Sequence, residues 1–276
     1  KGIQGYSVQS LSSDPTASEV EGQLWYNSST GKFKVAEAGA GAWSSGGDLN
    51  TARVTSQGAA GTQTAGLIFG GSQPVPLGGS SASTEKYDGT SWTEVNDLPG
   101  GLNETTGSGT QTAALAIGGW YVTPPEAKTA VAFEYDGTSW TTGGSMPAAN
   151  ANMASDGPQT AAIAFGGGSP ISAAAFTYNG STFTTIGSLN SGRMKLAGFG
   201  TTTAAVAAGG APPLGALCES YDGSTWTEVN NINTARDGVS GWGIQTSGLI
   251  AGGAEPAVSS KTEKFDGTSW TELADL

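Results

Sequence analysis

The chain contains no histidine, a single cysteine and few charged residues. Without histidine it lacks the side chain that most often acts as a general base and metal ligand near neutral pH. The lone Cys218 excludes an internal disulfide framework and leaves the redox compartment open. We therefore expect a protein that is not an enzyme, with no catalytic residue, no metal site and no cofactor.

Charge and long apolar runs are also scarce. Charged residues make up 12% of the chain and sum to a formal −12, which repels both nucleic-acid phosphates and anionic lipid headgroups. The longest apolar runs, such as Ala204–Ala208, have the length of a strand, far short of the roughly 20 residues of a membrane-spanning helix. We expect a soluble protein that neither binds nucleic acid nor inserts into membranes. Because it begins at Lys1 without Met, we expect a fragment or a processed product.

Glycine, in contrast, is abundant, and much of it belongs to two repeated signatures. The first, a Gly-Thr-Gln turn or a variant of it followed by an apolar run and a Gly pair, occurs in five copies: 61–71, 109–119, 157–167, 200–210 and 243–253. The second, Tyr-Asp-Gly-Thr-Ser-Trp-Thr and its variants, alternates with the first at 87–93, 135–141, 178–184, 221–227 and 265–271. Internal repeats at such a period indicate a repeat architecture.

The spacing between the signatures is constant in one half of the repeat only. The aromatic residue of the second signature recurs at Trp92, Trp140, Phe183, Trp226 and Trp270, and Trp43 stands at the same distance before the first Gly pair. From each of the first five of these six aromatics to the second Gly of the next pair, the separation is 28, 27, 27, 27 and 27 residues. From that Gly to the next aromatic it is 21, 21, 16, 16 and 17. Insertions are therefore confined to the segment after each Gly pair.

Each repeat has the pattern of four strands. Thr64–Phe69 is a short apolar run typical of an interior strand, and Arg53–Ala59 supplies another strand before it. Thr84–Tyr87 and Ser91–Val95 flank an Asp-Gly pair, which is typical of a tight hairpin. A four-stranded antiparallel sheet per repeat, with small residues on the inner strand, predicts an all-β propeller.

These features resemble the kelch family: a strand that ends in a Gly pair, an aromatic before an Asp-Gly turn, a Trp, and an Arg that opens the next unit, at Arg53, Arg193 and Arg236. The resemblance covers residues 50–276 as five kelch-like repeats. Residues 1–49 contain Gly22-Gln-Leu-Trp-Tyr-Asn27, Lys32–Val35 and Trp43, and are interpreted as an atypical blade, so that six blades form one domain. The alternative is five blades with a separate N-terminal hairpin.

Residues with possible chemistry have simpler structural explanations. The Asp-Gly carboxylates Asp88, Asp136, Asp222 and Asp266 would suggest calcium sites, yet a hairpin turn selects Asp before Gly, and Asn179 replaces it in one copy. Cys218 falls in a column of small residues and is expected to be a packed thiol. The kelch resemblance includes a radical-copper oxidase type, which requires the histidine that this chain lacks. Paired carboxylates of a glycan-active enzyme remain an alternative.

The segments of variable length, which follow the Gly pairs, are the candidate binding region. They span 72–82, 120–130, 168–173, 211–216 and 254–261, and they contain eight of the chain's 12 prolines. In a four-stranded antiparallel blade these loops all lie at the end where consecutive blades are connected. Variation on one rim of a constant scaffold is typical of a binding surface. The candidate ligand-binding residues are Trp120, Tyr121, Pro74, Pro124, Pro212 and Pro256.

The segment Glu21–Val35 resembles a Gly-x-Leu-Trp-Tyr-Asn hairpin of tailed-bacteriophage virion proteins, and the repeats resemble kelch-type virion proteins of marine phages. This resemblance implies a tail-fibre or surface-decoration protein in the virion. Its partners would be other virion proteins and a host cell-surface glycan or protein. Alternative hypotheses are a purely structural spacer or ornament, a glycan-active enzyme, and a cellular kelch interaction domain.

Overall fold

The computed structural model describes residues 9–11, 24–27, 32–35, 43–53, 58–73, 79–121, 127–168, 170–213 and 215–276. The chain divides into two compact units, Lys1–Trp43 and Ser44–Leu276. In the first unit, β1 (Gln9–Leu11), β2 (Leu24–Asn27) and β3 (Lys32–Val35) form a three-stranded sheet. Strand β1 is parallel to β2, and β3 is antiparallel to it.

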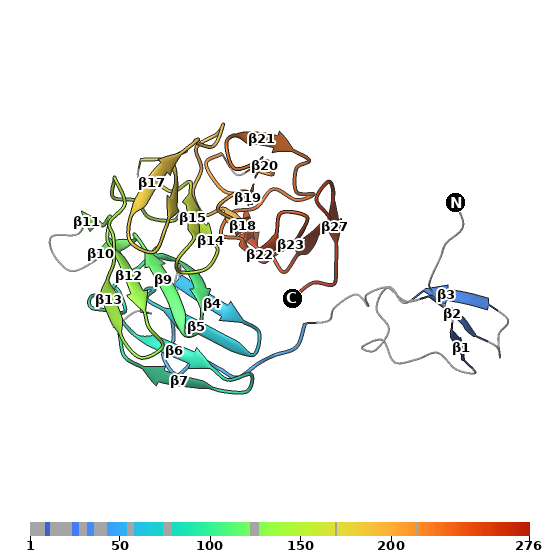
Figure 1. Cartoon of the computed structure of the whole chain (residues 1–276), viewed down its shortest axis with the longest axis horizontal. Coiled ribbons are helices and arrows are strands. Elements are labelled where there is room, and N and C mark those ends of the chain that lie inside the picture. Colours follow the sequence, from blue (N-terminus) through green and yellow to red (C-terminus); the bar gives the residue numbers. More distant parts are fainter. Residues whose placement is uncertain are drawn as a thin grey trace. The chain divides into compact units, whose positions relative to one another are not determined.

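The second unit is a β-propeller of five four-stranded antiparallel sheets, which follow one another around a common centre (Figure 1). Blade 1 has β4 (Gly58–Thr62), β5 (Ala65–Phe69), β6 (Thr84–Tyr87) and β7 (Trp92–Val95). Blade 2 has β8 (Thr106–Thr110), β9 (Ala113–Ile117), β12 (Ala132–Tyr135) and β13 (Trp140–Thr142). Blade 3 has β14 (Ala154–Asp156), β15 (Ala162–Phe165), β16 (Ala175–Tyr178) and β17 (Phe183–Ile186). Blade 4 has β18 (Ala197–Thr201), β19 (Ala204–Ala208), β20 (Cys218–Tyr221) and β21 (Trp226–Val229). Blade 5 has β22 (Ser240–Ile244), β23 (Ser247–Ala251), β26 (Thr262–Phe265) and β27 (Trp270–Glu272).

The predicted fold class is confirmed: the described residues form an all-β propeller whose blades have four antiparallel strands. The favoured count of six blades is wrong, and the structure has the alternative count of five. The N-terminal strands form a mixed sheet of three strands, whereas each blade has four antiparallel ones. The physical reason lies in the sequence, because residues 1–49 carry the aromatic Trp43 but no Gly-Thr-Gln turn leading into an apolar run and a Gly pair.

The inner strands approach one another too closely for large side chains. A Cβ atom added at Gly107 in β8 would lie 2.5 Å from the carbonyl oxygen of Ala59 in β4. One added at Gly198 in β18 would lie 2.6 Å from the Cβ of Ala154 in β14. Both distances are shorter than van der Waals contact, so the backbones can converge only at glycine. This explains why the inner strands are rich in Gly, Ala and Ser.

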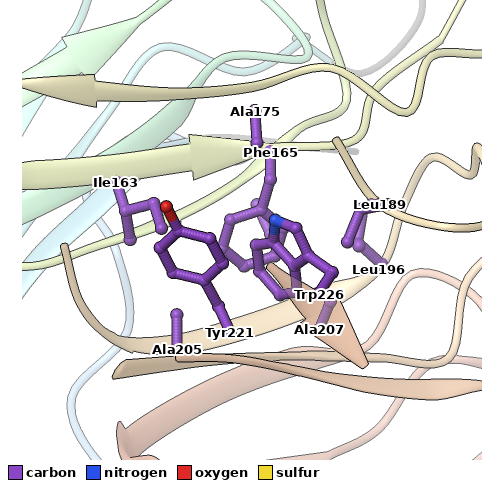
Figure 2. Close-up of a cluster of buried hydrophobic side chains, with 10 residues drawn as sticks. Ile163, Phe165, Ala175, Leu189, Leu196, Ala205, Ala207, Tyr221 and Trp226 are labelled. Atoms are coloured by element: carbon purple, nitrogen blue, oxygen red, sulfur yellow. The ribbon is translucent and has the colours of Figure 1, made fainter. Parts of the chain in front are cut away.

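Hydrophobic clusters fill the spaces between consecutive blades, and alternate residues of one strand serve opposite sides. In β19, Ala205 and Ala207 pack toward blade 3, while Val206 and Ala208 pack toward blade 5. We call the side of a blade that faces the preceding blade its leading face, and the other side its trailing face. Figure 2 shows the junction of blades 3 and 4, where Tyr221 and Trp226 of the leading face of blade 4 meet residues of blade 3 that include Ile163, Phe165 and Leu189.

Each leading face carries the aromatic pair of the second repeat signature. The ring centroids of Tyr221 and Trp226 lie 5.0 Å apart, and Trp226 makes an edge contact with Phe165 of blade 3 at 4.8 Å. Trp140 of blade 2 contacts Phe69 of blade 1 in the same way, also at 4.8 Å. Such edge contacts add stability beyond the apolar area that they bury. The recurring aromatic of the sequence is therefore the residue that joins one blade to the one before it.

Three blades also contain a buried ion pair. Arg53, Arg193 and Arg236 pair with Glu85, Glu219 and Glu263, and the six side chains are at most 4% exposed. Although burial acts to raise the pKa of Glu85, hydrogen bonds from Arg53 and from Asn50 and Thr51 outweigh it and keep that pKa below its ordinary value. In blades 2 and 3 the same two positions hold Leu102 with Phe133 and Asn150 with Phe176. These two positions of the repeat therefore accept either an ion pair or an uncharged pair of residues.

A chain of backbone hydrogen bonds links blades 2 to 5 just before their inner strands. The N–H of Gly238 donates to Lys195, Lys195 donates to Asn152, and Asn152 donates to Glu104. All four residues have positive φ, between 53° and 63°. The left-handed conformation costs most L-residues about 1–2 kcal/mol, whereas glycine adopts it without strain and asparagine tolerates it.

We expect Lys195→Gly to raise the free energy of unfolding by about 0.5–1 kcal/mol, because relief of left-handed strain exceeds the added chain entropy of glycine. Asn152→Gly is the matched control, and its effect is expected to be near zero because Asn tolerates this conformation. Urea unfolding of the two variants beside the parent measures the difference. Destabilisation by Lys195→Gly would contradict this explanation.

Candidate functional site

The two ends of the propeller differ, and one end is built from the same turns in every blade. The Asp-Gly turn lies beside the turn that joins the first two strands of its own blade. A Cβ atom added at Gly89 would lie 3.6 Å from the Cα of Thr64, and one added at Gly223 would lie 3.6 Å from the Cα of Thr203. Asp88 accepts backbone hydrogen bonds from Thr90 and Ser91 at 2.9 and 2.8 Å. These bonds, that from Ser91 first, hold the pKa of Asp88 below its ordinary value. We call this end the turn face.

The repeated carboxylates of the turn face thus stabilise their own hairpins. The same pair of backbone bonds is accepted by Asp136, Asp222 and Asp266, and by the side-chain amide oxygen of Asn179 in blade 3. Within the described part of the chain, no three His, Cys, Asp or Glu side chains lie close enough together to hold a metal ion. The geometry therefore favours the turn interpretation of these residues over the calcium one.

Glutamines of the turn face join consecutive blades. Gln159 in the first turn of blade 3 donates to the carbonyls of Ala114 and Tyr135 in blade 2, both at 2.8 Å. Gln111 and Gln245 donate in the same way to Tyr87 and Tyr221 of the blades that precede theirs. The glutamine of the first repeat signature is accordingly a structural feature, because its amide satisfies polar atoms of the neighbouring sheet.

The opposite end carries the loops that follow the Gly pairs. In blades 1 to 4 the Gly pair is anchored to the start of the next blade by a backbone bond: Gly71 donates to Leu102, Gly119 to Asn150, Gly167 to Arg193 and Gly210 to Arg236, at 2.8–2.9 Å. In blade 5 the loop begins at Ala254, which pairs with Asp237 as Ala211 of blade 4 pairs with Met194. All these loops therefore lie at the end where one blade leads into the next. We call this end the loop face, and its described residues are 72–73, 79–82, 120–121, 127–130, 168, 170–173, 211–213, 215–216 and 254–261.

The loop of blade 2 contains the two predicted aromatic residues. Strand β10 (Trp120–Tyr121) pairs with β11 (Ala127–Lys128) in a short hairpin. The backbone of Trp120 exchanges two hydrogen bonds with Asn103, at 2.8 and 3.1 Å. Tyr121 packs against the hydrophobic cluster between blades 1 and 2. Both side chains are half-buried, and Tyr121 belongs in part to the core.

The predicted prolines that the structure describes are exposed. Pro256 lies between β24 (Ala254–Glu255) and β25 (Ala257–Val258) in the loop of blade 5. Pro212 lies in the loop of blade 4 and is joined to Pro213 by a cis peptide bond. Pro74 and Pro124 lie outside the described residues. Four of the six predicted binding residues are thus described, and all four lie on the loop face. Pro212 and Pro256 are exposed, and Trp120 and Tyr121 are half-buried.

Sequence reasoning missed Val258, whose side chain is 94% exposed in the loop of blade 5. Close by, Glu255 accepts hydrogen bonds from the Ser259 hydroxyl at 2.9 Å and from Lys261 at 3.4 Å. The bond from Ser259 keeps the pKa of Glu255 below its ordinary value. The usable signal was an apolar side chain two positions after a proline and directly before the polar run 259–261.

Comparison with known proteins assigns no function to this chain. No protein-family model matches this chain, and no curated protein matches it in sequence. Within its described residues there is no helix long and apolar enough to cross a membrane. Since a propeller by itself implies no activity, the function must be argued from the loop face.

Cys218 is expected to be inert in the native protein. Its side chain is fully buried between blades 4 and 5, and this burial raises the pKa of the thiol to about 12. Because the thiolate is the reactive form, an aromatic disulfide reagent should release no chromophore near neutral pH until denaturant is added. One equivalent should then react. Rapid reaction of the native protein would contradict the packed position.

Proposed function

We propose that this protein is a non-enzymatic component of a phage particle, a tail-fibre or surface-decoration module, whose loop face attaches to the surface of the host. The observation that carries the proposal is the asymmetry of the propeller. The turn face repeats one construction in every blade, while the loop face presents loops of different length and structure. Variation at one end of a rigid scaffold is how repeat proteins commonly recognise partners.

Two further features support attachment as the role of this face. The loops present exposed apolar atoms at Pro212, Pro256 and Val258, and proline restricts the chain entropy that binding would otherwise cost. Trp120 supplies an aromatic surface of the kind that stacks on sugars. The resemblance of the repeats to kelch-type virion proteins, and of Glu21–Val35 to a phage hairpin segment, supports the choice of a virion protein. The expected ligand is a cell-surface glycan or protein, and the other partners are virion proteins.

Adhesion of the purified full chain to cells from a panel of marine bacteria tests this proposal. In the variant, the loops 72–82 and 120–130 are shortened to the length of 168–173, the loop of blade 3. We expect adhesion to a responsive strain to fall by at least about ten-fold, since loss of roughly 1.4 kcal/mol of contact suffices for that change.

The matched control changes the other end of the same molecule. Asp222→Asn in the turn of blade 4 copies Asn179 of blade 3 and should leave adhesion unchanged. If the loop variant adheres as well as the parent, or the turn variant loses adhesion to the same extent, the loop face is not the attachment surface.

A further inference from the structure

The loops of the loop face differ from the rest of the chain in their charged and polar residues. The five loops, 72–82, 120–130, 168–173, 211–216 and 254–261, contain two glutamates and two lysines, so that they are neutral as a set. They contain no Asp, Asn or Arg. The net charge of −12 therefore lies outside them, and four of its carboxylates stand on the turn face: Asp88, Asp136, Asp222 and Asp266.

The charges in the loop of blade 5 are paired with each other. Glu255 accepts hydrogen bonds from Ser259 and Lys261 at 2.9 and 3.4 Å, and Lys261 also donates to the hydroxyl of Thr234 at 2.9 Å. The side chains of Lys261 and Glu255 are 36% and 27% exposed. An ion pair that has formed within the loop attracts a charged ligand less than an isolated charge does.

Hydroxyl groups of the loops are engaged in the same way. In blades 1, 2, 3 and 5 one Ser or Thr side chain accepts the backbone N–H of the residue two positions later, at 3.0–3.3 Å: Ser81, Thr129, Ser172 and Ser259. Ser81, Thr129 and Ser259 are at most 7% exposed. Recognition of a sugar depends on polar groups that are free to bond to its hydroxyls, and these four serve their own loops instead.

Apolar side chains are exposed on three consecutive loops, those of blades 3, 4 and 5. Ile171 is 39% exposed and Val258 is 94% exposed. The prolines beside them and in the loop of blade 4 are exposed as well: Pro170, Pro212, Pro213 and Pro256. A surface that is poor in charge and rich in apolar residues has the composition of the central part of a protein–protein interface.

We infer that the host-surface ligand of the loop face is a protein that presents an uncharged, apolar patch, and that Val258 lies within the contact. The inference rests on the proposed function and decides between its two ligand classes, glycan and protein. Because the loops carry no net charge, attachment depends on removal of apolar area from water and not on ion pairing. Salt screens charges and leaves this contribution in place.

Adhesion of the purified full chain to a responsive strain tests the inference, with the cells treated beforehand in two ways. A protease of broad specificity removes surface proteins, and periodate cleaves the vicinal diols of sugars. We expect protease treatment to lower adhesion by at least about ten-fold and periodate treatment to leave it unchanged. Raising NaCl from about 0.1 to about 1 M should leave adhesion within about two-fold of its starting value.

A charge placed in the contact tests the position of the patch. Val258→Asp should lower adhesion to untreated cells by at least about ten-fold, because the contact then buries a charge without a partner. Thr138→Asp is the matched control, because it adds the same charge to an exposed position in the Asp-Gly turn of blade 2, on the turn face. It should change nothing.

Four results would each overturn the inference: loss of adhesion after periodate, unchanged adhesion after protease, a fall of about ten-fold at high salt, or equal adhesion of the Val258→Asp and Thr138→Asp variants. Loss after periodate or at high salt identifies a sugar or a charged ligand in place of the apolar protein patch. The proposed function is decided separately, by shortening of the loops 72–82 and 120–130 and adhesion to untreated cells.

Discussion

Arg236→Leu is expected to lower the free energy of unfolding by about 3–5 kcal/mol, because it leaves the carboxylate of Glu263 buried without its cationic partner. Both side chains are fully buried, and Nη2 of Arg236 lies 2.7 Å from Oε1 of Glu263. The guanidinium also donates to the carbonyls of Gly252 and Lys261 at 2.8 and 2.7 Å. Urea unfolding followed by tryptophan fluorescence measures the change.

The double variant Arg236→Leu with Glu263→Phe is the control, because it installs the pair that blade 2 has in Leu102 and Phe133. Replacing a buried ion pair by packed apolar residues is commonly close to neutral, so the double variant should recover more than about half of the loss. If the single variant costs less than about 1 kcal/mol, the ion pair is not an element that stabilises blade 5.

Phe199→Ala is expected to cost about 3–5 kcal/mol, the usual loss when a buried phenylalanine is truncated. Phe199 is fully buried in β18, and its ring centroid lies 6.3 Å from that of Trp270 in the next blade. Its ring also fills the space beside Gly248, where an added Cβ would lie 2.2 Å from it. Truncation therefore opens a cavity at the junction of blades 4 and 5.

Trp242→Ala is the matched control, since Trp242 occupies the same column of the repeat in blade 5 and is 44% exposed. We expect a loss of about 1–2 kcal/mol from this larger side chain, because less of its surface leaves water on folding. Equal losses for the two variants would show that the two positions are covered alike in solution, contrary to the 44% exposure of Trp242.

The elements of the propeller were predictable because the repeat presents each of them five times. The run 64–69 predicted β5 (Ala65–Phe69), and the Asp-Gly pair predicted the hairpin of β6 (Thr84–Tyr87) and β7 (Trp92–Val95). The first strand of the blade was predicted less accurately. Its expected range began at Arg53, but Arg53 is an ion-pair partner of Glu85, and β4 begins at Gly58. Repetition identifies an element, while its ends depend on tertiary contacts.

The candidate site was predictable in position and less so in composition. Strand connectivity alone requires the loops after the Gly pairs to lie at one end, and backbone bonds such as that from Gly119 to Asn150 bear this out. Whether an aromatic loop residue points outward depends on packing that has no sequence signal, and Tyr121 lies partly in the core.

An image of the assembled particle at subunit resolution tests the central claim, that the loop face is the surface presented to the host. The account predicts that the loops 120–130, 211–216 and 254–261 point away from the particle into solvent, while neighbouring virion proteins contact other parts of the propeller. A loop face buried against neighbouring subunits would contradict it and would leave the protein a structural spacer.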